Sequence, residues 1–367
     1  MNICILQDYL RNGGTERQSI LLAREFIAAG HPTTLVRFRP GGALEKTLGE
    51  VPSAVLQPFD CRLACFAPGL VRRLRALSPD VILCMGREAN RRGARLRRAF
   101  PDTVIVATLR TGKALPADFR RSLSTADRVV ANSEASARRL REEFTLPADR
   151  VAVIKNALVF PPAQGDRNLA LREQFGAGAG TVVLLCAGMF RPEKNQAALL
   201  RAATRLPRDA DWQLWLAGDG PSLTGCRALA AKLGLDDRVR FLGFQSALSP
   251  VYRAADVAVL TSRSESLSNF LIEAQAHGLP AVAYAATGVD ECIEDGVTGR
   301  VVAMDDERAL LEALGALIAD PVLRERQARH AAAFGCTAFQ PEARAADYLR
   351  LFALLRPTRP GHLSLNK

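Results

Sequence analysis

Two cations that lie three residues apart are the first sign of chemistry in this chain. The turn that begins at Gly188 follows an apolar run and carries Arg191 and Lys194. Arginine can hold a diphosphate through its planar fork, and lysine can hold it as a point charge. A second glycine-rich turn at Gly218 follows the next apolar run and is, by itself, an ordinary strand-to-helix connection. We therefore predict an anion-binding site at these turns.

A pair of carboxylates, Glu265 and Glu273, lies further along the chain. Between them, Ser268 is predicted to cap a helix that runs from Asn269 to about His277. A phosphate can bind the free N–H groups at the start of such a helix, where the helix dipole favours negative charge. Glu273, about one turn deeper, can accept hydrogen bonds from a ribose diol. It could equally be a solvated helix residue, but its neighbours are nearly all apolar, so we expect it to have a partner.

The first half of the chain has one comparable turn, Gly13-Gly14, after its first apolar run. Thr15 and Gln18 fit a capping box, with Thr15 as the N-cap, so a helix is predicted to begin here. Two glycines at a helix start let backbone N–H groups approach an anion. A plain tight turn without a ligand explains the same residues.

Short apolar runs that alternate with amphipathic stretches predict the elements that position these turns. The expected strands cover residues 3–6, 34–38, 81–85, 104–109, 129–131, 151–154, 182–187, 212–217, 239–242, 257–260, 281–285 and 300–302. Strands that are continuous in Val, Ile and Leu are typical of parallel sheets covered on both faces. The expected fold class is α/β, with two doubly wound Rossmann-like domains that face each other across a cleft.

The domain boundaries follow from the length and from the composition between the two halves. A chain of 367 residues usually forms two domains. We expect a first domain at 1–160, a Pro- and Gly-rich linker at 161–180 and a second domain at 181–340. Residues 341–367 are expected to form a helix that packs back on the first domain, followed by a tail.

Taken in order, the motifs resemble glycosyltransferase family 4. They are Gly-Gly-x-Glu after the first strand, x-Pro-Glu-Lys-Asn at the start of the second domain, Ala-Gly-Asp-Gly-Pro, Phe-Leu-Gly-Phe and Glu-x7-Glu. The resemblance implies a retaining enzyme of the GT-B fold that binds a nucleotide-sugar donor mostly in its second domain and an acceptor mostly in its first. It implies that Glu273 holds the ribose, that Glu265 contacts the transferred sugar, and that Lys194 and a nearby arginine neutralise the diphosphate.

The donor site expected from the motifs and the resemblance extends over both domains. The backbone amides of Leu267, Ser268 and Asn269 are implied to bind the phosphate and sugar. The residues expected to bind the nucleotide sugar are Gly13, Gly14, Gly188, Arg191, Lys194, Gly218, Leu267, Ser268, Asn269 and Glu273. Those expected to be catalytic are Lys194, Arg191 and Glu265.

The chain departs from the family pattern at two places. Met189 stands where the family often has arginine, so Arg191 supplies the charge from another position or Lys194 acts alone. Many members carry a histidine in a loop of the first domain whose equivalent here is residues 108–113, and none of the four histidines of this chain falls there. We therefore expect no histidine base.

Stabilisation of a leaving diphosphate is the main catalytic task expected of this site. The one Asp-x-Asp motif in the sequence, at residues 209–211, comes just before an expected strand and not after one, so it lies away from the strand ends that carry the other motifs. We accordingly expect no metal and no cofactor, with Arg191, Lys194 and the helix end at Asn269 in place of a divalent ion. The predicted reaction is metal-independent transfer with retention, in which the departing phosphate oxygen takes the acceptor proton.

The positive charge of the chain is confined to its first half. Residues 1–160 hold 26 basic and 15 acidic side chains, whereas residues 161–367 hold 23 of each, and the whole chain has a formal charge of +11. Three arginines are predicted to share one face of a helix, the pattern of a membrane-surface helix, and a further arginine and lysine suit an anionic acceptor. These are Arg91, Arg95 and Arg98, then Arg110 and Lys113. Nucleic acid is disfavoured because the basic segments lack interleaved aromatic residues.

The expected location is the cytoplasm, with peripheral contact to the inner face of the plasma membrane. The eight cysteines are scattered, and neither a signal peptide nor an apolar run of membrane-spanning length is visible. The predicted acceptor is a cell-envelope glycan or glycolipid such as lipopolysaccharide core, and the predicted donor is a UDP-sugar. A nucleotide-sugar epimerase of the same fold is the alternative. A dehydrogenase would require G-x-G-x-x-G after the first strand, where this sequence has Asn-Gly-Gly-Thr. An inactive binding protein would lack Glu265, which is present, so both alternatives are disfavoured.

Overall fold

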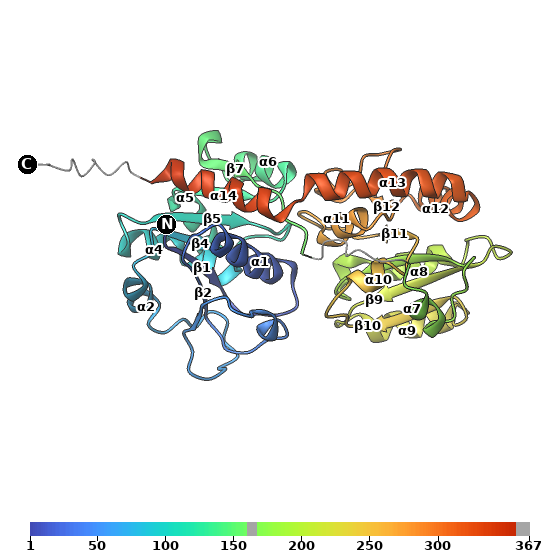
Figure 1. Cartoon of the computed structure of the whole chain (residues 1–367), viewed down its shortest axis with the longest axis horizontal. Coiled ribbons are helices and arrows are strands. Elements are labelled where there is room, and N and C mark those ends of the chain that lie inside the picture. Colours follow the sequence, from blue (N-terminus) through green and yellow to red (C-terminus); the bar gives the residue numbers. More distant parts are fainter. Residues whose placement is uncertain (160–166, 357–367) are drawn as a thin grey trace, which may run out of the picture.

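The computed structural model describes residues 1–159 and 167–356, which form two α/β domains lying beside each other (Figure 1). The first domain contains β1 (Ile3–Gln7), β2 (Thr33–Arg37), β3 (Ser53–Val55), β4 (Val81–Cys84), β5 (Val104–Leu109), β6 (Arg128–Ala131) and β7 (Val151–Val153). The second contains β8 (Val182–Ala187), β9 (Trp212–Ala217), β10 (Val239–Gly243), β11 (Val257–Leu260), β12 (Ala281–Tyr284) and β13 (Gly299–Val302).

Both sheets consist of parallel pairs, in the orders β3-β2-β1-β4-β5-β6-β7 and β10-β9-β8-β11-β12-β13. The strand order reverses beside β1 in one sheet and beside β8 in the other. Such a switch point opens a crevice at the carboxyl ends of the strands. The predicted fold class is therefore confirmed. The sequence did not predict β3, because three residues that begin with an exposed serine show no apolar run.

Helices cover both faces of each sheet, and the side chains that the central strands direct to either face are buried. In the first domain, α1 (Gly14–Ala28) lies on one face, and α2 (Leu70–Leu77), α4 (Gly93–Ala99), α5 (Ala117–Thr125) and α6 (Glu134–Glu142) lie on the other. In the second, α10 (Ser249–Tyr252) and α11 (Asn269–Ala276) lie opposite α8 (Gln196–Ala203), α9 (Leu223–Lys232) and α12 (Glu307–Ala319). Each domain therefore has two apolar clusters, one on each face of its sheet.

The last helix connects the two domains. It follows α13 (Pro321–Ala338), and α14 (Pro341–Leu355) extends over the first domain beside α1 (Figure 1). Phe26 of α1 packs edge-on against Tyr348 and Phe352 of α14, with ring centroids 6.2 and 5.8 Å apart. The end of the chain therefore forms part of the first domain's core.

The segment predicted as a linker is only partly described by the structure, since residues 160–166 lie outside the described ranges. Its later part contains α7 (Leu169–Gln174). Arg172 of this helix is buried and pairs with Asp256, with Nη1 3.0 Å from Oδ2. This pairing attaches α7 to the second domain.

The predicted capping box is wrong. Helix α1 begins at Gly14, its N-cap is Gly13, and no side chain caps it. Gln18 is buried, and its amide both donates to the carbonyl of Ala157 (2.6 Å) and accepts from the N–H of the same residue (3.0 Å). Both ends of the Gln18 amide are therefore engaged with Ala157 and not with the end of the helix.

The single arginine-bearing helix predicted around residue 91 is also wrong. The segment forms α3 (Arg87–Arg91) and α4, with a break at Arg92. Gly93 lies against α5 so closely that an added Cβ would be 2.9 Å from Cβ of Ser122, and Ser122 Oγ accepts from the N–H of Ala94. This contact turns the chain, so Arg91 and Arg95 lie on different helices.

Two further features bear on the sequence predictions. Cys4, Cys84, Cys186 and Cys292 are buried, and all eight cysteines are free. No helix within residues 1–159 and 167–356 is both long and apolar enough to cross a membrane.

Candidate active site between the domains

A cleft of about 680 Å³ lies where the carboxyl ends of the two sheets face each other. It is lined by all ten residues predicted to bind the nucleotide sugar, and by Glu265 and Arg110. The ten are Gly13, Gly14, Gly188, Arg191, Lys194, Gly218, Leu267, Ser268, Asn269 and Glu273. Most of these residues follow the end of a parallel strand, so the fold brings them together from distant parts of the sequence.

Two of the glycines lie at close approaches within the cleft. At Gly218, φ is +140°, and an added Cβ would lie 2.0 Å from the carbonyl oxygen of Gly188. At Gly14, an added Cβ would lie 2.5 Å from Nδ2 of Asn269, across the cleft. The first contact holds the β8 and β9 turns together, and the second brings α1 against the start of α11.

The start of α11 opens into the cleft as predicted. Ser268 is its N-cap, and Ser268 Oγ accepts from the N–H of Leu271 at 3.4 Å. Ser268 and Asn269 both line the cleft. The first turn of the helix can thus present backbone N–H groups and the positive end of its dipole to an anion.

Glu273 is a buried carboxyl group with the partner that its apolar neighbours required. Only 3% of the residue is exposed, and Tyr252 OH donates to Oε2 at 2.9 Å. Burial raises the pKa of Glu273 to about 7, against the opposing effects of the Tyr252 hydrogen bond and the charge of Arg17. The same burial raises the pKa of Tyr252 well above 10. The site therefore contains a carboxyl group that titrates near neutral pH.

The two predicted cations reach the cleft from the turn after β8. Lys194 Nζ lies 2.6 Å from Glu265 Oε1, and both groups line the cleft. Met189, where the family often has arginine, and Arg191 line it as well. Arg191 thus supplies positive charge to the same cavity from two residues further along the chain.

Two side chains that the sequence analysis missed, Asn156 and Tyr348, connect the predicted residues Arg110 and Asn269. Asn156, after β7, donates from Nδ2 to Oδ1 of Asn269 at 2.6 Å. Arg110 Nη1 donates to Asn156 Oδ1 at 2.6 Å, and Arg110 Nη2 donates to Tyr348 OH at 2.7 Å. These hydrogen bonds connect Tyr348 of α14, through Arg110 and Asn156, to Asn269 at the start of α11. We call this network the relay.

The remaining residues predicted to face an anionic acceptor or surface lie outside the cleft. Lys113 Nζ pairs with Glu193 Oε1 across the domains at 2.8 Å, and Arg91 pairs with Glu88 and Asp118. Arg95 and Arg98 are exposed on α4. Arg110 alone of this set lines the cleft, where Asn156 and Tyr348 hold it. The structure therefore does not bring these five residues together.

Acidic, histidine and cysteine side chains do not gather into a metal site in the part of the chain that the structure describes. Among residues 1–159 and 167–356, no three of them are grouped so that they could hold an ion. The described lining of the cleft also includes no histidine.

Two doubly wound domains that meet over such a cleft define the GT-B class of fold. The sequence model described as "Glycosyltransferase Family 4" matches residues 12–158, and that described as "Glycosyl transferases group 1" matches residues 168–334. HepE of Anabaena, solved in complex with UDP, superposes with a TM-score of 0.83 at 23% identity over 96% of this chain and all of that one. The structural likeness shows the fold.

Sequence relatives then identify the family. A D-inositol 3-phosphate glycosyltransferase of Mycobacterium sp. (strain KMS) is 31% identical over 91% of this chain and 81% of its own length. The protein of the same name from Mycolicibacterium vanbaalenii is 36% identical over 66% of this chain and 57% of its own length. The chain spans 46 to 57% of the length of this relative and of two others with that name. The chain belongs to glycosyltransferase family 4.

Proposed function

We propose that this protein transfers a sugar, with retention of configuration, from a nucleoside-diphosphate sugar in the cleft to an acceptor on the first domain. The observation that carries the proposal is the arrangement around α11. Glu273, buried and bonded to Tyr252, lies one turn below a helix start that opens into the cleft beside Arg191 and Lys194. A nucleoside-diphosphate sugar has a ribose at one end and a diphosphate next to it. Glu273 is placed to bind the ribose, and the helix start with Arg191 and Lys194 is placed to bind the diphosphate.

The charges of the site suit a leaving diphosphate. As the glycosidic bond breaks, negative charge grows on the phosphate oxygens, and fixed positive groups in a cleft lower the barrier most. Arg191, Lys194 and the dipole of α11 supply this charge. Lys194 pairs with Glu265, so a bound diphosphate would compete for the ammonium group and leave the carboxylate to the transferred sugar.

We propose that these groups act without a divalent metal and without a histidine base. Retention then requires the departing phosphate oxygen to accept the proton of the acceptor hydroxyl, on the same face of the sugar that the leaving group vacates. The bond from the sugar to the phosphate breaks, and the bond from the sugar to the acceptor oxygen forms, through an oxocarbenium-like transition state. The residues of the cleft hold the diphosphate and sugar, and the substrate itself moves the proton.

For the donor we propose a UDP-sugar. The support is the close likeness of fold to HepE, whose structure contains UDP. Thermal-shift measurements with UDP-, GDP- and ADP-sugars test the base directly. The largest stabilisation is expected for a UDP-sugar, and a stronger response to a GDP- or ADP-sugar would replace this choice.

For the acceptor we propose a cell-envelope glycan or glycolipid such as lipopolysaccharide core. The support is the positive charge on the outer surface of the first domain, which suits an acceptor held in an anionic layer of the cell envelope. The name of the sequence relatives favours a second candidate, a phosphorylated cyclitol. Both candidates are anionic, so parallel assays with each acceptor and the same donor decide between them.

The decisive experiment follows labelled sugar from the donor to the product. Transfer is expected in the presence of EDTA, with the anomeric configuration of the donor retained in the product by NMR. Loss of transfer on chelation and its recovery with Mn2+ would overturn metal independence. Conversion of one nucleotide sugar into its epimer without any acceptor would show that the protein is an epimerase.

A further inference from the structure

A loop at the edge of the first domain exposes three large apolar side chains. Phe59, Leu63 and Phe66 are 70%, 56% and 45% exposed, and they account for three of the ten exposed large apolar residues in the described ranges. They all lie in residues 57–66, which we call the apolar loop. Such a concentration is unusual on the surface of a soluble protein and marks a surface that meets a partner.

The conformation of the apolar loop is fixed from beneath by a buried glutamine. Gln57 is 1% exposed, and its Nε2 donates to the carbonyl groups of Leu63 (2.8 Å) and Phe66 (2.6 Å). Its Oε1 accepts from the N–H of Cys61 at 3.3 Å. One buried amide thus holds three main-chain groups of the loop, and the apolar side chains remain outside.

An ion pair fixes the loop a second time. Arg39 donates to both oxygens of Asp60, at 2.8 Å each, and the N–H of Arg62 donates to Asp60 Oδ1 at 2.8 Å. The bond to Arg39 lowers the pKa of Asp60 to about 2, so the clamp persists at any physiological pH. The exposed apolar side chains therefore belong to an organised surface.

The chain segment that begins with the apolar loop is strongly basic. Residues 57–98 contain ten arginines and three acidic residues, and each acidic residue is paired with an arginine. Arg92 donates to the carbonyl of Cys65, which joins the loop to the α3–α4 junction. The exposed arginines of this segment are Arg62, Arg72, Arg73, Arg75, Arg87, Arg95 and Arg98.

We propose that the apolar loop and the arginines beside it dock the first domain on an anionic lipid bilayer. Phe59, Leu63 and Phe66 enter the interfacial region, while the arginines bind lipid phosphates. A second copy of the chain is a poorer occupant, because a symmetric contact would place arginines against arginines. The inference does not depend on the proposed activity, since the loop lies outside the cleft.

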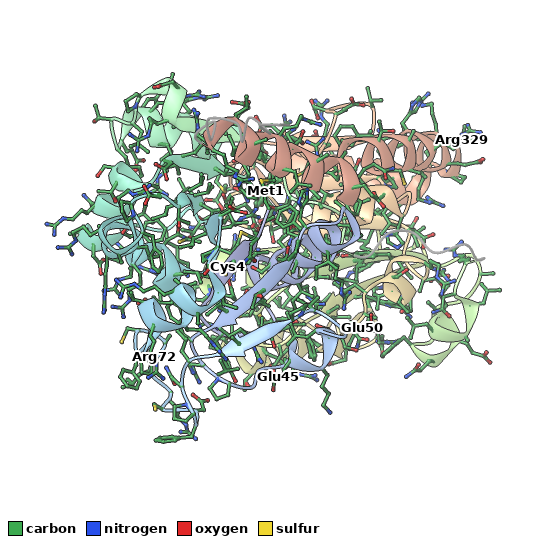
Figure 2. All side chains as sticks on the ribbon, turned by 60° about the vertical axis from the view of Figure 1, so that its left-hand side comes forward. Met1, Cys4, Glu45, Glu50, Arg72 and Arg329 are labelled. Carbon is green, nitrogen blue, oxygen red and sulfur yellow. The ribbon has the colours of Figure 1, made fainter. Side chains whose placement is uncertain are left out.

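The position of this surface suits a membrane-bound transferase. Helix α2, which follows the loop, lies at the end of the first domain that is remote from the second domain (Figure 1). Arg72 of α2 lies at the outer margin of the molecule (Figure 2). Docking there would leave the cleft accessible to a water-soluble donor and hold the first domain close to lipid-borne acceptors.

Vesicle co-sedimentation tests the proposal on the full chain. The wild-type protein is expected to bind vesicles with 30% phosphatidylglycerol in phosphatidylcholine and to bind pure phosphatidylcholine far more weakly. The double variant Phe59→Ser/Phe66→Ser should bind the anionic vesicles about tenfold more weakly. Each of Arg72→Gln and Arg73→Gln should weaken binding by about fivefold and reduce its salt dependence.

A matched control separates this surface from general apolar exposure. Val322 and Leu354 are 73% and 81% exposed on other elements, so Val322→Ser/Leu354→Ser should bind vesicles like wild type. All variants should keep the wild-type melting temperature, because the changed side chains are exposed. Equal vesicle binding by wild type and the loop variants would overturn the proposal. So would a concentration-dependent dimer in sedimentation velocity that the loop variants abolish.

Discussion

The cleft has two walls, one from each domain, and they differ in the kinds of side chain that line them. The second domain contributes charged and buried groups: Glu273 with Tyr252, the pair Lys194–Glu265, and the start of α11. The first domain contributes glycines, amide side chains and two arginines. Arg110 is bonded to Asn156, and Asn156 is bonded to Asn269 on the other side of the cleft. One wall therefore carries the charges that we propose bind the donor, whereas the other contributes contacts between the two domains.

The charge distribution shows the same division. The second half is neutral overall, although it holds the cations of the donor site, while the first half carries the entire excess. Of the basic residues predicted at the acceptor, Lys113 pairs with Glu193 across the domains, and Arg110 donates to Asn156 and Tyr348 within the first domain. Most of the remaining arginines in residues 57–98 are exposed outside the cleft. The excess positive charge thus belongs to an outer surface.

The largest effect expected to test this comparison comes from two lysines, Lys194 in the cleft and Lys113 of the first domain outside it. Lys194→Ala removes a fixed charge from the leaving group and should lower kcat/KM by 10² to 10³, or about 3 to 4 kcal/mol. Lys113→Ala breaks a pair whose lysine is 54% exposed and should cost less than fivefold. Steady-state transfer assays of both variants measure the contrast. Equal losses would show that positive charge of the first domain outside the cleft is also needed for transfer.

The second prediction concerns the buried carboxyl group. Because the pKa of Glu273 is raised from 4.5 to about 7, ionising it in the folded protein opposes folding. Its favourable contribution is complete below about pH 4.5 and is lost as the pH rises through 7. Glu273→Gln cannot ionise and should be about 3 kcal/mol more stable than wild type at pH 8, with a difference that shrinks as the pH falls.

Urea unfolding at pH 8 and pH 5.5 measures this difference in the free energy of unfolding. Glu312→Gln is the control, because its side chain is 63% exposed on α12 and should change stability by less than about 0.5 kcal/mol at either pH. A Glu273→Gln difference that stays constant between the two pH values would contradict the raised pKa.

The third prediction alters the contact between the walls without changing any charge. In Gly14→Ala the new Cβ meets Nδ2 of Asn269, so the Asn156–Asn269 bond must shift or break. We expect a loss of about tenfold in kcat/KM, near 1.4 kcal/mol, with little change in the melting temperature. Gly225→Ala on α9 is the control, since its Cβ meets open space. Full activity of Gly14→Ala would mean that the walls need not approach so closely.

The sequence predicted the second wall far better than the first. The residues that line the cleft from the second domain lie in short motifs after strands, so local spacing was enough to select Gly188, Lys194, Ser268 and Glu273. Tyr252 was missed because its short helix carries no pattern that points to a carboxyl group 21 residues away. Its proximity to Glu273 arises from packing on the sheet.

The first wall depends on contacts that no local pattern reports. Asn156 and Asn269 are 113 residues apart, and Arg110 and Tyr348 are 238 apart. The two local errors share a cause, since Gln18 and Gly93 each form a tertiary contact that overrides the helix signal of their own segment. The fold class and most strands could therefore be predicted, while the contacts that join the domains could not.

The smallest effect is expected at the far end of the relay, where Tyr348 accepts a hydrogen bond from Arg110. Tyr348→Phe keeps the ring packing against Phe26 and removes only the hydroxyl group, so its direct cost should be about 1 kcal/mol of stability. Arg110 also positions Asn156, which in turn positions Asn269 at the start of α11. Transfer should therefore fall by about threefold, mainly through KM for the donor.

A purely structural role for Tyr348 would lower the melting temperature and leave KM unchanged, so the two measurements separate the possibilities. Tyr9→Phe, in a half-buried tyrosine of the first domain outside the relay, should alter neither. If Tyr348→Phe raises KM, then combining it with Asn156→Ala should add little, because both changes interrupt the same path. Fully additive effects would show that α14 stabilises the first domain without influencing the donor helix.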